Sequence, residues 1–502
     1  MENNKKSWHA AVVILLLVLI CLSGLAFSAK TMSSSLWIDE ARSVEIGLKS
    51  FSGILTEVSK DNHPPLYYLV LSLWMKVFGI SETAVRGISI FFYLVAVISI
   101  YYAGSLIYGK RHAGLISAAL YAVSAIAIRH SASARMYSMV SLLEIWSIIM
   151  FYKTFLSGKT TLQKAEWLAA VNILGSFTHY WFLFVILGQL LYCVLFRVKE
   201  WKYIAGIYAA SILPLFLLWG GVIYRQSTNG SMNFIVNMRP SILTVTVDDF
   251  FYGKTASVIA LVILASFAAL LFRLRDRRQT GTIKEAILSP FKFILEDKNI
   301  FLLLLFVVIL VVPYLVSIKI VPVYIAGRYT IVTFVPFVLL LSGFAWKYAS
   351  KLVFWIVLLI FIINIYINNY AFSKNFDIRS DRYRAGYLAQ SVKEGDAVIF
   401  VGLSKIPTDY YLRLYKFSKN ITEFSFPGDI DSKHPCWTND HIMTPELEKE
   451  FRDKISGLKT GNIWVVGGEE PDMDKGVKRV LLEKHRLVKK LANNMERYEG
   501  KR

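Results

Sequence analysis

Cysteine and charge are scarce in this chain of 502 residues. Its three cysteines are Cys21 and Cys193, in apolar segments, and Cys436, which stands alone in a polar tail. This spacing offers neither a disulfide framework nor a metal site of the Cys-x-x-Cys type. Charged residues make up only 18% of the chain. We also find no short-period repeat and no low-complexity linker.

Apolar residues are abundant instead. They make up 55% of the chain, whose mean hydropathy is +0.47, more than a soluble protein of this size needs to fill a core. Apolar runs of roughly 15–22 residues recur along the sequence, which predicts a polytopic α-helical membrane protein. The net charge is +20, but Lys and Arg collect in loops, where the anionic inner surface of a bilayer is a sufficient partner. We therefore expect no nucleic acid partner.

The first apolar segment follows MENNKKSW and lacks a clear cleavage site. We interpret it as a retained signal-anchor helix with a cytoplasmic N-terminus. About eleven transmembrane helices are predicted. Their ranges are 8–28, 87–107, 113–128, 137–156, 165–179, 181–196, 203–222, 255–272, 300–318, 329–346 and 352–370.

Residues 65–79, PLYYLVLSLWMKVFG, are apolar but are left out of this set, because about 15 residues are too few to cross the hydrocarbon core. The positive-inside rule supports the omission. Without this span, five basic loops all face the cytoplasm: Lys110–Arg111, Lys159–Lys164, Arg197–Lys202, Arg273–Lys298 and Lys347–Lys351. With it, all five would face outside. We therefore predict that 65–79 forms a helix lying at the outer interface of the membrane.

This topology divides the chain into a membrane domain, residues 1–370, and an extracytoplasmic domain, residues 371–502. A large first outer loop with interfacial helices separates the first two spans. The tail contains strand-like runs at 397–402 and 462–468 and an amphipathic helical stretch at 382–395. Such a mixture predicts a small α/β domain.

An acidic pair, Asp39 and Glu40 in LWIDEARS, stands in the first outer loop. Spacing alone leaves two interpretations open. The pair is either a solvated first turn of an interfacial helix, where the dipole favours acids, or a general base with a second carboxylate beside it. As ligands of Mg or Mn the two acids form an incomplete cage. We therefore expect no obligatory metal or other cofactor, while a divalent metal stays open.

Several cationic groups are predicted on the same outer face. His63 precedes two prolines that end one helix and begin the next, so free backbone N–H groups beside it could bind an anion; a simple turn is the plainer interpretation. Arg135 and Arg328 stand at outer helix ends, where a snorkelling arginine is the commoner role. With His63 they would suit a ligand that has a phosphate headgroup and a lipid tail. His179, in a tight turn, is expected to cap or to pack.

The motifs resemble those of C-type glycosyltransferases, in particular glycosyltransferase family 39 and its bacterial relatives. This group includes protein O-mannosyltransferases and the aminoarabinose transferases that modify lipid A. The similar segments span about residues 8–346 and read, in order, WIDEA, HPPLYYLVLSLWMKVFG, SETAVR, ARMYS, THY and GRYTIVTFVPF.

The resemblance implies a multi-helix fold and a donor sugar carried on a polyprenyl phosphate. It implies that Asp39 is the catalytic carboxylate and that Glu40 supports it. Polyprenyl phosphate leaves readily, so the enzyme needs cations for the phosphate and one base for the acceptor hydroxyl. A glycosidase, by contrast, needs two carboxylates flanking the bond. A single displacement with Asp39 as base would invert the anomeric centre.

The resemblance also implies a phosphate-binding group. Arg328 and Tyr329 match the family's Arg-Tyr near the phosphate, and Arg135 and Tyr137 match its Arg-x-Tyr near the outer cavity. His63 joins this group and departs from the lysine that the aminoarabinose branch has at that place, which leaves the identity of the donor sugar open.

Two other classes of function remain open. A transporter or flippase of a lipid-linked sugar would use the same phosphate site, although no inverted repeats with broken helices are visible in the sequence. A binding or scaffold protein would rely on the tail, which carries no cofactor fingerprint. For a transferase, the acceptor could be a protein, a lipid or a glycan.

Overall fold

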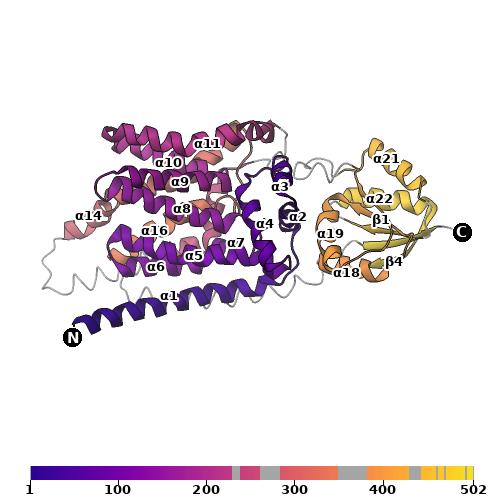
Figure 1. Cartoon of the computed structure of the whole chain (residues 1–502), viewed down its shortest axis with the longest axis horizontal. Coiled ribbons are helices and arrows are strands. Elements are labelled where there is room, and N and C mark those ends of the chain that lie inside the picture. The colour runs from indigo at the N-terminus through magenta and orange to yellow at the C-terminus, as the bar shows by residue number, and fades with distance from the viewer. Residues whose placement is uncertain are drawn as a thin grey trace.

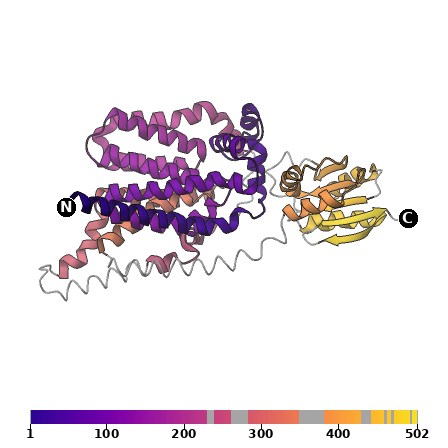
Figure 2. The same ribbon diagram turned by 60° about the horizontal axis from the view of Figure 1, so that its bottom comes forward.

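A computed structural model describes residues 2–228, 238–259, 283–348, 381–428, 442–458, 462–467, 471–491 and 495–500. It consists of a helical bundle and a small α/β domain, which lie end to end along the long axis of the molecule (Figure 1). The turned view shows the same arrangement, with the α/β domain beyond one end of the bundle (Figure 2). We call this end of the bundle the domain end.

Six helices among the described residues are long and apolar enough to cross a membrane. They are built on α1 (Glu2–Met32), α5 (Glu82–Tyr108), α8 (Tyr137–Phe151), α11 (Trp201–Thr228), α15 (Asp297–Lys319) and α16 (Ile331–Tyr348). A seventh span arises if α6 (Arg111–Ala122) and α7 (Ala125–Ser131), which are bent by 64°, are taken together. The predicted class of fold, a helical polytopic membrane protein with a small α/β domain, is confirmed.

The predicted number of about eleven spans stays a prediction. Two of them correspond to α9 (Leu162–Thr178) and α10 (Phe182–Phe196), which have 17 and 15 residues. The predicted span at 352–370 and most of the one at 255–272 lie outside the described residues. Shorter helices α12 (Ser241–Asp248) and α14 (Ile283–Ile294) complete the described bundle.

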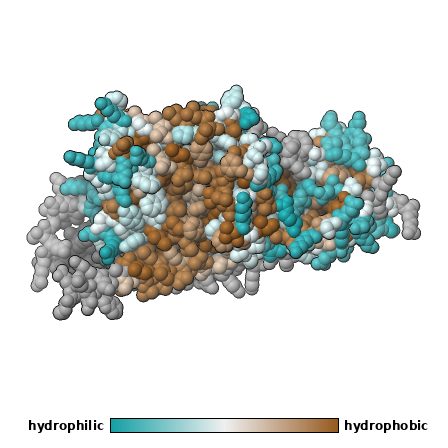
Figure 3. Space-filling view, viewed as in Figure 1, coloured by the Kyte–Doolittle hydropathy of each residue, from teal (hydrophilic) through white to brown (hydrophobic). Residues whose placement is uncertain are grey.

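A hydrophobic band crosses the bundle, with polar residues at both of its ends and over the α/β domain (Figure 3). Basic loops meet at the end opposite the domain end. Arg197 bonds Asp297 at 3.0 Å, Lys347 bonds Glu296 at 2.8 Å, and Tyr108 bonds Asn299 at 3.0 Å. The positive-inside rule predicts that this end is cytoplasmic. The predicted sidedness of the two termini rests on that rule.

Three short helices, α2 (Ile38–Gly47), α3 (Phe51–Val58) and α4 (Leu66–Phe78), lie across the domain end (Figure 1). The 13 residues of α4 would span only about 20 Å, less than the hydrocarbon thickness of a bilayer. One face of α4 buries Tyr67, Tyr68 and Leu71, while Leu73 and Val77 are exposed. This helix therefore lies along the end of the bundle, as the sequence predicts for 65–79.

The α/β domain contains a five-stranded sheet in the order β2-β1-β3-β5-β4. Strand β1 (Ala397–Val401) pairs in parallel with β2 (Thr422–Phe426) and β3 (Asn462–Val466). Strand β5 (Met495–Gly500) pairs antiparallel with β3 and with β4 (His485–Leu491). The two strand-like runs of the sequence are thus neighbours in the centre of the sheet.

Alternate residues of the central strands face two helical layers, because side chains of a strand point to opposite faces. Val398, Phe400 and Trp464 pack with α18 (Asp381–Ser391) and α19 (Lys405–Leu414). Ile399 and Val465 pack with α21 (Pro445–Ser456) and α22 (Pro471–Lys484). The predicted boundary between the two domains, at 370/371, lies outside the described residues.

The α/β domain is bonded directly to the loop that leads into α2. The Tyr411 hydroxyl, on α19, accepts a hydrogen bond from the backbone N–H of Leu36 at 2.7 Å. Tyr410 donates to the carbonyl of Ile80 at 2.7 Å, and Arg382 forms an ion pair with Glu82. The first outer loop is therefore held between the bundle and the α/β domain.

Replacing Tyr411 by Phe is expected to lower the free energy of unfolding by about 1–3 kcal/mol, because the buried Leu36 N–H loses its acceptor. The change can be measured by denaturant or thermal unfolding of the detergent-purified chain. Tyr415→Phe is the matched control, since its hydroxyl makes only an exposed contact of 3.4 Å with the Arg382 carbonyl. Equal stability of Tyr411→Phe and Tyr415→Phe would contradict this assignment.

Candidate active site

Asp39 lies in the first turn of α2, at the domain end. Its Oδ2 is 3.2 Å from Nη1 of Arg328, and the side chains are 21% and 42% exposed. The guanidinium of Arg328 lies over the ring of Trp37, at 4.6 Å from the ring centroid. An exposed ion pair of this kind contributes at most about 1 kcal/mol, so a ligand can open it. Sequence analysis named both residues, and the structure brings them together.

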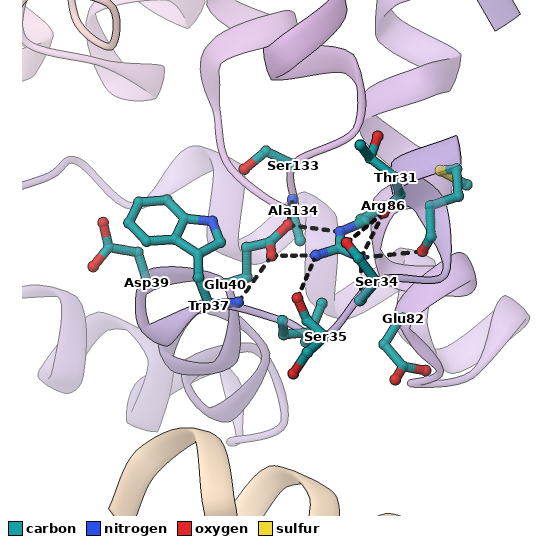
Figure 4. A network of polar contacts seen from close by, with 12 residues as sticks. Thr31, Ser34, Ser35, Trp37, Asp39, Glu40, Glu82, Arg86, Ser133 and Ala134 are labelled. Carbon is teal, nitrogen blue, oxygen red and sulfur yellow. Dashed lines mark hydrogen bonds and ion pairs between the residues drawn. The ribbon is translucent and has the colours of Figure 1, made fainter. Parts of the chain in front are cut away.

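Glu40 has a different environment (Figure 4). It is buried, and its two oxygens accept from Nε and Nη2 of Arg86 at 2.9 and 2.6 Å. The backbone N–H groups of Ala134 and Trp37 complete its bonds, at 2.7 and 3.2 Å. In the same view Asp39 points away from this network.

Arg86 ties the segment before α2 to α5. Besides binding Glu40, it donates to the carbonyl oxygens of four residues of this segment: Thr31, Met32, Ser34 and Ser35. Both oxygens of Glu40 are thus engaged in holding the chain in place. The predicted role of Glu40, to support the catalytic Asp39, stays a prediction. Sequence analysis missed Arg86; the signal was an arginine at the start of an apolar helix, where a charge needs a partner.

Four buried side chains form a closed ring of contacts next to Asp39. Arg135 approaches Tyr68 and His63, through Nη1 to the hydroxyl at 3.4 Å and through Nη2 to Nε2 at 3.4 Å. Asp61 closes the ring, with Oδ2 at 3.3 Å from the Tyr68 hydroxyl and Oδ1 at 3.3 Å from Nδ1 of His63. Arg135 also bonds the carbonyl of Asp39 at 3.3 Å. Asp61 is a second residue that sequence analysis missed.

The ring fixes the protonation of its members. A guanidinium can only donate, so Nε2 of His63 accepts and its proton lies on Nδ1, facing Asp61. Burial lowers the pKa of His63 below its ordinary value, although the hydrogen bond to Asp61 opposes this. Burial raises the pKa of Tyr68 well above its ordinary value, so its hydroxyl stays a donor to Asp61. His63 is therefore neutral at physiological pH.

Aromatic side chains pack around this ring of four residues. The Tyr329 hydroxyl lies 3.2 Å from Nε2 of His63, and its ring contacts that of His179 at 4.6 Å. Tyr137 lies 6.4 Å from Tyr329 and 4.3 Å from His130, measured between ring centroids. His179 accepts the backbone N–H of Trp181 at 3.1 Å, which agrees with the predicted capping role. All five predicted phosphate-binding residues thus lie at the domain end around Asp39.

The loop that carries Arg328 and Tyr329 is anchored just before them. His130 contacts the carbonyl of Gly327 at 2.9 Å through Nε2. Arg129 and Asp249 form a two-fold ion pair, with bonds of 2.8 and 3.0 Å, beside the same glycine. Gly327 has φ of +72°, and a Cβ there would lie 2.6 Å from Oδ2 of Asp249 and 2.9 Å from Nη1 of Arg129. Only glycine leaves this pair undisturbed.

Gly327→Ala is expected to destabilise the protein by about 1–2 kcal/mol through left-handed strain and also to displace the Arg129–Asp249 pair. Gly253→Ala is a matched control, because Gly253 has the same φ of +72° and a Cβ added there would meet nothing within 4 Å. Thermal unfolding of both variants separates strain from displacement. If Gly253→Ala were as destabilising as Gly327→Ala, the anchoring role of this pair would be wrong.

Within the part of the chain that the structure describes, no three His, Cys, Asp or Glu side chains are grouped in a way that could hold a metal ion. Both oxygens of Glu40 are bound to Arg86 and to backbone N–H groups, so the pair Asp39 and Glu40 does not offer two free carboxylates. Whether the protein needs a divalent metal stays a prediction.

Comparisons with known proteins bear on this arrangement. Residues 62–219 match the model of a family described as dolichyl-phosphate-mannose-protein mannosyltransferase. No curated sequence matches the chain. Among solved structures, apo ArnT from Cupriavidus metallidurans is similar with a TM-score of 0.62 and 12% identity, covering 98% of both chains. ArnT bound to undecaprenyl phosphate gives 0.63 and 12%, covering 97% of both chains.

The chain has the fold of ArnT. Both the bundle and the α/β domain take part in this likeness, because it covers nearly the whole of each chain. The archaeal oligosaccharyltransferase AglB from Archaeoglobus fulgidus, in complex with an inhibitory peptide and a dolichol-phosphate, gives a TM-score of 0.47 at 11% identity, covering 99% of this chain and 74% of that one. The predicted resemblance to C-type glycosyltransferases is confirmed. The segment of this chain that matches the family model includes His63, Arg135 and Tyr137. Asp39 lies before that segment.

Proposed function

We propose that the protein is a membrane glycosyltransferase that moves a sugar from a polyprenyl-phosphate donor to an acceptor hydroxyl. The observation that carries this proposal is the contact between Asp39 and Arg328, a partly exposed carboxylate and guanidinium 3.2 Å apart at one end of an ArnT-like membrane fold. The neighbouring acids, Glu40 and Asp61, are buried and bonded to other groups. Asp39 is therefore the carboxylate best suited to act on an incoming substrate.

The chemistry needs little more than these groups. Arg328 leaves Asp39 to bind the donor phosphate, with Arg135 behind it, and this stabilises the negative charge that grows on the leaving phosphate. Asp39, freed from its ion pair, accepts the proton of the acceptor hydroxyl. The acceptor oxygen forms its bond to the anomeric carbon as the bond to the phosphate oxygen breaks. One displacement of this kind inverts the anomeric centre.

The remaining predicted residues serve this site in different ways. Tyr329 and His63 line the phosphate site beside Arg135. Tyr137 packs against Tyr329 and His130. Glu40 is a positioning residue in this scheme, since it anchors the first turn of α2 through Arg86. We expect no obligatory metal, because two arginines supply the positive charge that a cation would otherwise provide.

The site is proposed to lie on the extracytoplasmic side, with the α/β domain beside it. The basic loops gathered at the opposite end of the bundle support this orientation. The acceptor is a protein, a lipid or a glycan that reaches the site from the side of the α/β domain. Membrane lipid surrounds the hydrophobic band of the bundle.

The test is transfer by purified protein from a panel of polyprenyl-phosphate sugars, with water and candidate hydroxyl acceptors offered together. Turnover of one donor with inverted configuration at the anomeric carbon is expected. Retained configuration would overturn the single-displacement mechanism. Movement of the intact lipid-linked sugar across liposomes, without cleavage of any donor, would instead favour a transporter or flippase.

A further inference from the structure

The ring of Arg135, Tyr68, Asp61 and His63 contains an acid and an imidazole besides the arginine. Binding of a phosphate alone requires only the arginine. The proposed reaction starts from a phosphodiester with one negative charge and ends with a phosphate monoester that carries about two at neutral pH. The proposed phosphate site has four charged side chains, Asp39, Asp61, Arg135 and Arg328. Their charges sum to zero. Once Asp39 has released the proton of the acceptor hydroxyl, the site therefore holds one more negative charge than it did with the donor, unless another group there binds a proton.

His63 is placed to keep that proton. Its Nε2 carries a lone pair that faces the Arg135 guanidinium at 3.4 Å and the Tyr329 hydroxyl at 3.2 Å. Its Nδ1–H already points at the Asp61 carboxylate, at 3.3 Å. An imidazolium would keep the bond to Asp61 and turn Nε2 into a second donor.

Resting on the proposed function, we infer that Asp61 and His63 form a proton-holding pair that binds the phosphate monoester product. In this step Asp39 releases the proton that it took from the acceptor hydroxyl, Nε2 of His63 gains one proton, and Asp61 holds the resulting imidazolium. The total charge of the site is then the same before and after transfer. No other reactant is needed, because the proton lost and the proton gained balance.

Protonation would also rearrange the ring in a useful way. Nε2 can no longer accept from Arg135, so Nη2 of Arg135 is released toward the phosphate. One proton thus supplies two new donors, Nε2–H of His63 and an N–H of Arg135. The contact that must break, between Nη2 of Arg135 and Nε2 of His63, is long at 3.4 Å, and a hydrogen bond of such length is weak.

The groups that face His63 come from every element packed around it. They are Asp61 from its own loop, Tyr68 from α4, Arg135 from the segment before α8, His179 from the turn between α9 and α10, Tyr329 from the segment before α16 and, at longer range, Asp39 from α2. Asp61 opposes the lowering of the His63 pKa by burial and by Arg135. A doubly charged phosphate would raise that pKa further, so binding of the product should draw in a proton at pH 7.

The experiment is calorimetric binding of a short-chain polyprenyl phosphate to the full chain at pH 7, in buffers of different ionisation enthalpy, which gives the protons taken up per ligand. A polyprenyl phosphodiester serves as the singly charged comparison. The wild type is expected to take up close to one proton with the monoester and almost none with the diester. His63→Gln is expected to lose this uptake, and Asp61→Asn to reduce it and to weaken monoester binding about tenfold, the equivalent of one pKa unit.

His112→Gln is the matched control, since His112 stacks on Trp346 in the bundle, away from this ring. It should behave as the wild type does. Unchanged proton uptake in His63→Gln would overturn the inference while leaving the proposed transferase intact. If the wild type bound neither lipid, the phosphate site itself, and with it both proposals, would fail.

Discussion

Asp39→Asn should retain binding of the lipid-linked donor and lose about 10²–10⁴-fold in transfer rate, because the amide cannot accept the proton of the acceptor hydroxyl. The substitution keeps the shape of the side chain, and its carbonyl oxygen can still face Arg328. Donor affinity and single-turnover transfer should therefore be measured on the same preparation. Binding without turnover identifies Asp39 as the base rather than as a partner of the phosphate site.

A matched control for this variant is Asp297→Asn. Asp297 also pairs with an arginine, Arg197, at 3.0 Å, but at the opposite end of the bundle. It should transfer at the wild-type rate. If Asp39→Asn turned over normally, a different group would have to be the base, and the proposed mechanism would be wrong.

Arg86→Leu is expected to cost about 3–5 kcal/mol of stability, the range found when one partner of a buried ion pair is removed. Arg86 and Glu40 are 3% and 1% exposed as side chains, so the remaining carboxylate would stay buried without its counter-ion. The four carbonyl groups that Arg86 binds would lose their donor as well. Thermal unfolding in detergent should show a large loss of stability, and transfer should fall because α2 is no longer fixed.

The double variant Glu40→Leu with Arg86→Leu separates charge from packing. It should be more stable than Arg86→Leu, because no lone charge is left, yet less stable than the wild type, because the backbone groups stay unsatisfied. Arg86→Lys should fall short of full rescue, since an ammonium cannot reproduce the paired bonds of a guanidinium. Wild-type stability of Arg86→Leu would show that the network contributes little.

The sequence predicted those parts of the site that depend on topology. Asp39 and Arg328 both follow from the positions of apolar spans, because charged residues at the ends of the spans gather on one face. The same reasoning predicted that 65–79 would form a helix at the outer interface and not a span, since its length and the basic loops agree. These features are encoded in segment length and charge, which can be counted along the chain.

The missed residues depend on contacts between distant segments. In the sequence, Arg86 is an ordinary arginine at the start of a helix. Its bonds to Glu40 form only because α5 packs beside the loop before α2. Asp61 lies in a polar turn, and its neighbours in the sequence do not show that it is buried and bonded to His63 and Tyr68. Glu40 was expected to support Asp39, but the sequence does not show that its side chain binds Arg86, because consecutive residues of a helix point in different directions. The order of strands in the α/β domain was likewise beyond prediction, because it depends on pairings across long connections.

The bond between Leu36 and Tyr411 joins positions 375 residues apart. A ribosome makes the segment before α2 near the start of synthesis and α19 only near its end. The helix that carries Asp39 thus receives its last support when the chain is almost complete. A chain cut short before α19 would insert its first helices without this bond, so the loop that leads into α2 would lack one of its supports until synthesis is almost complete.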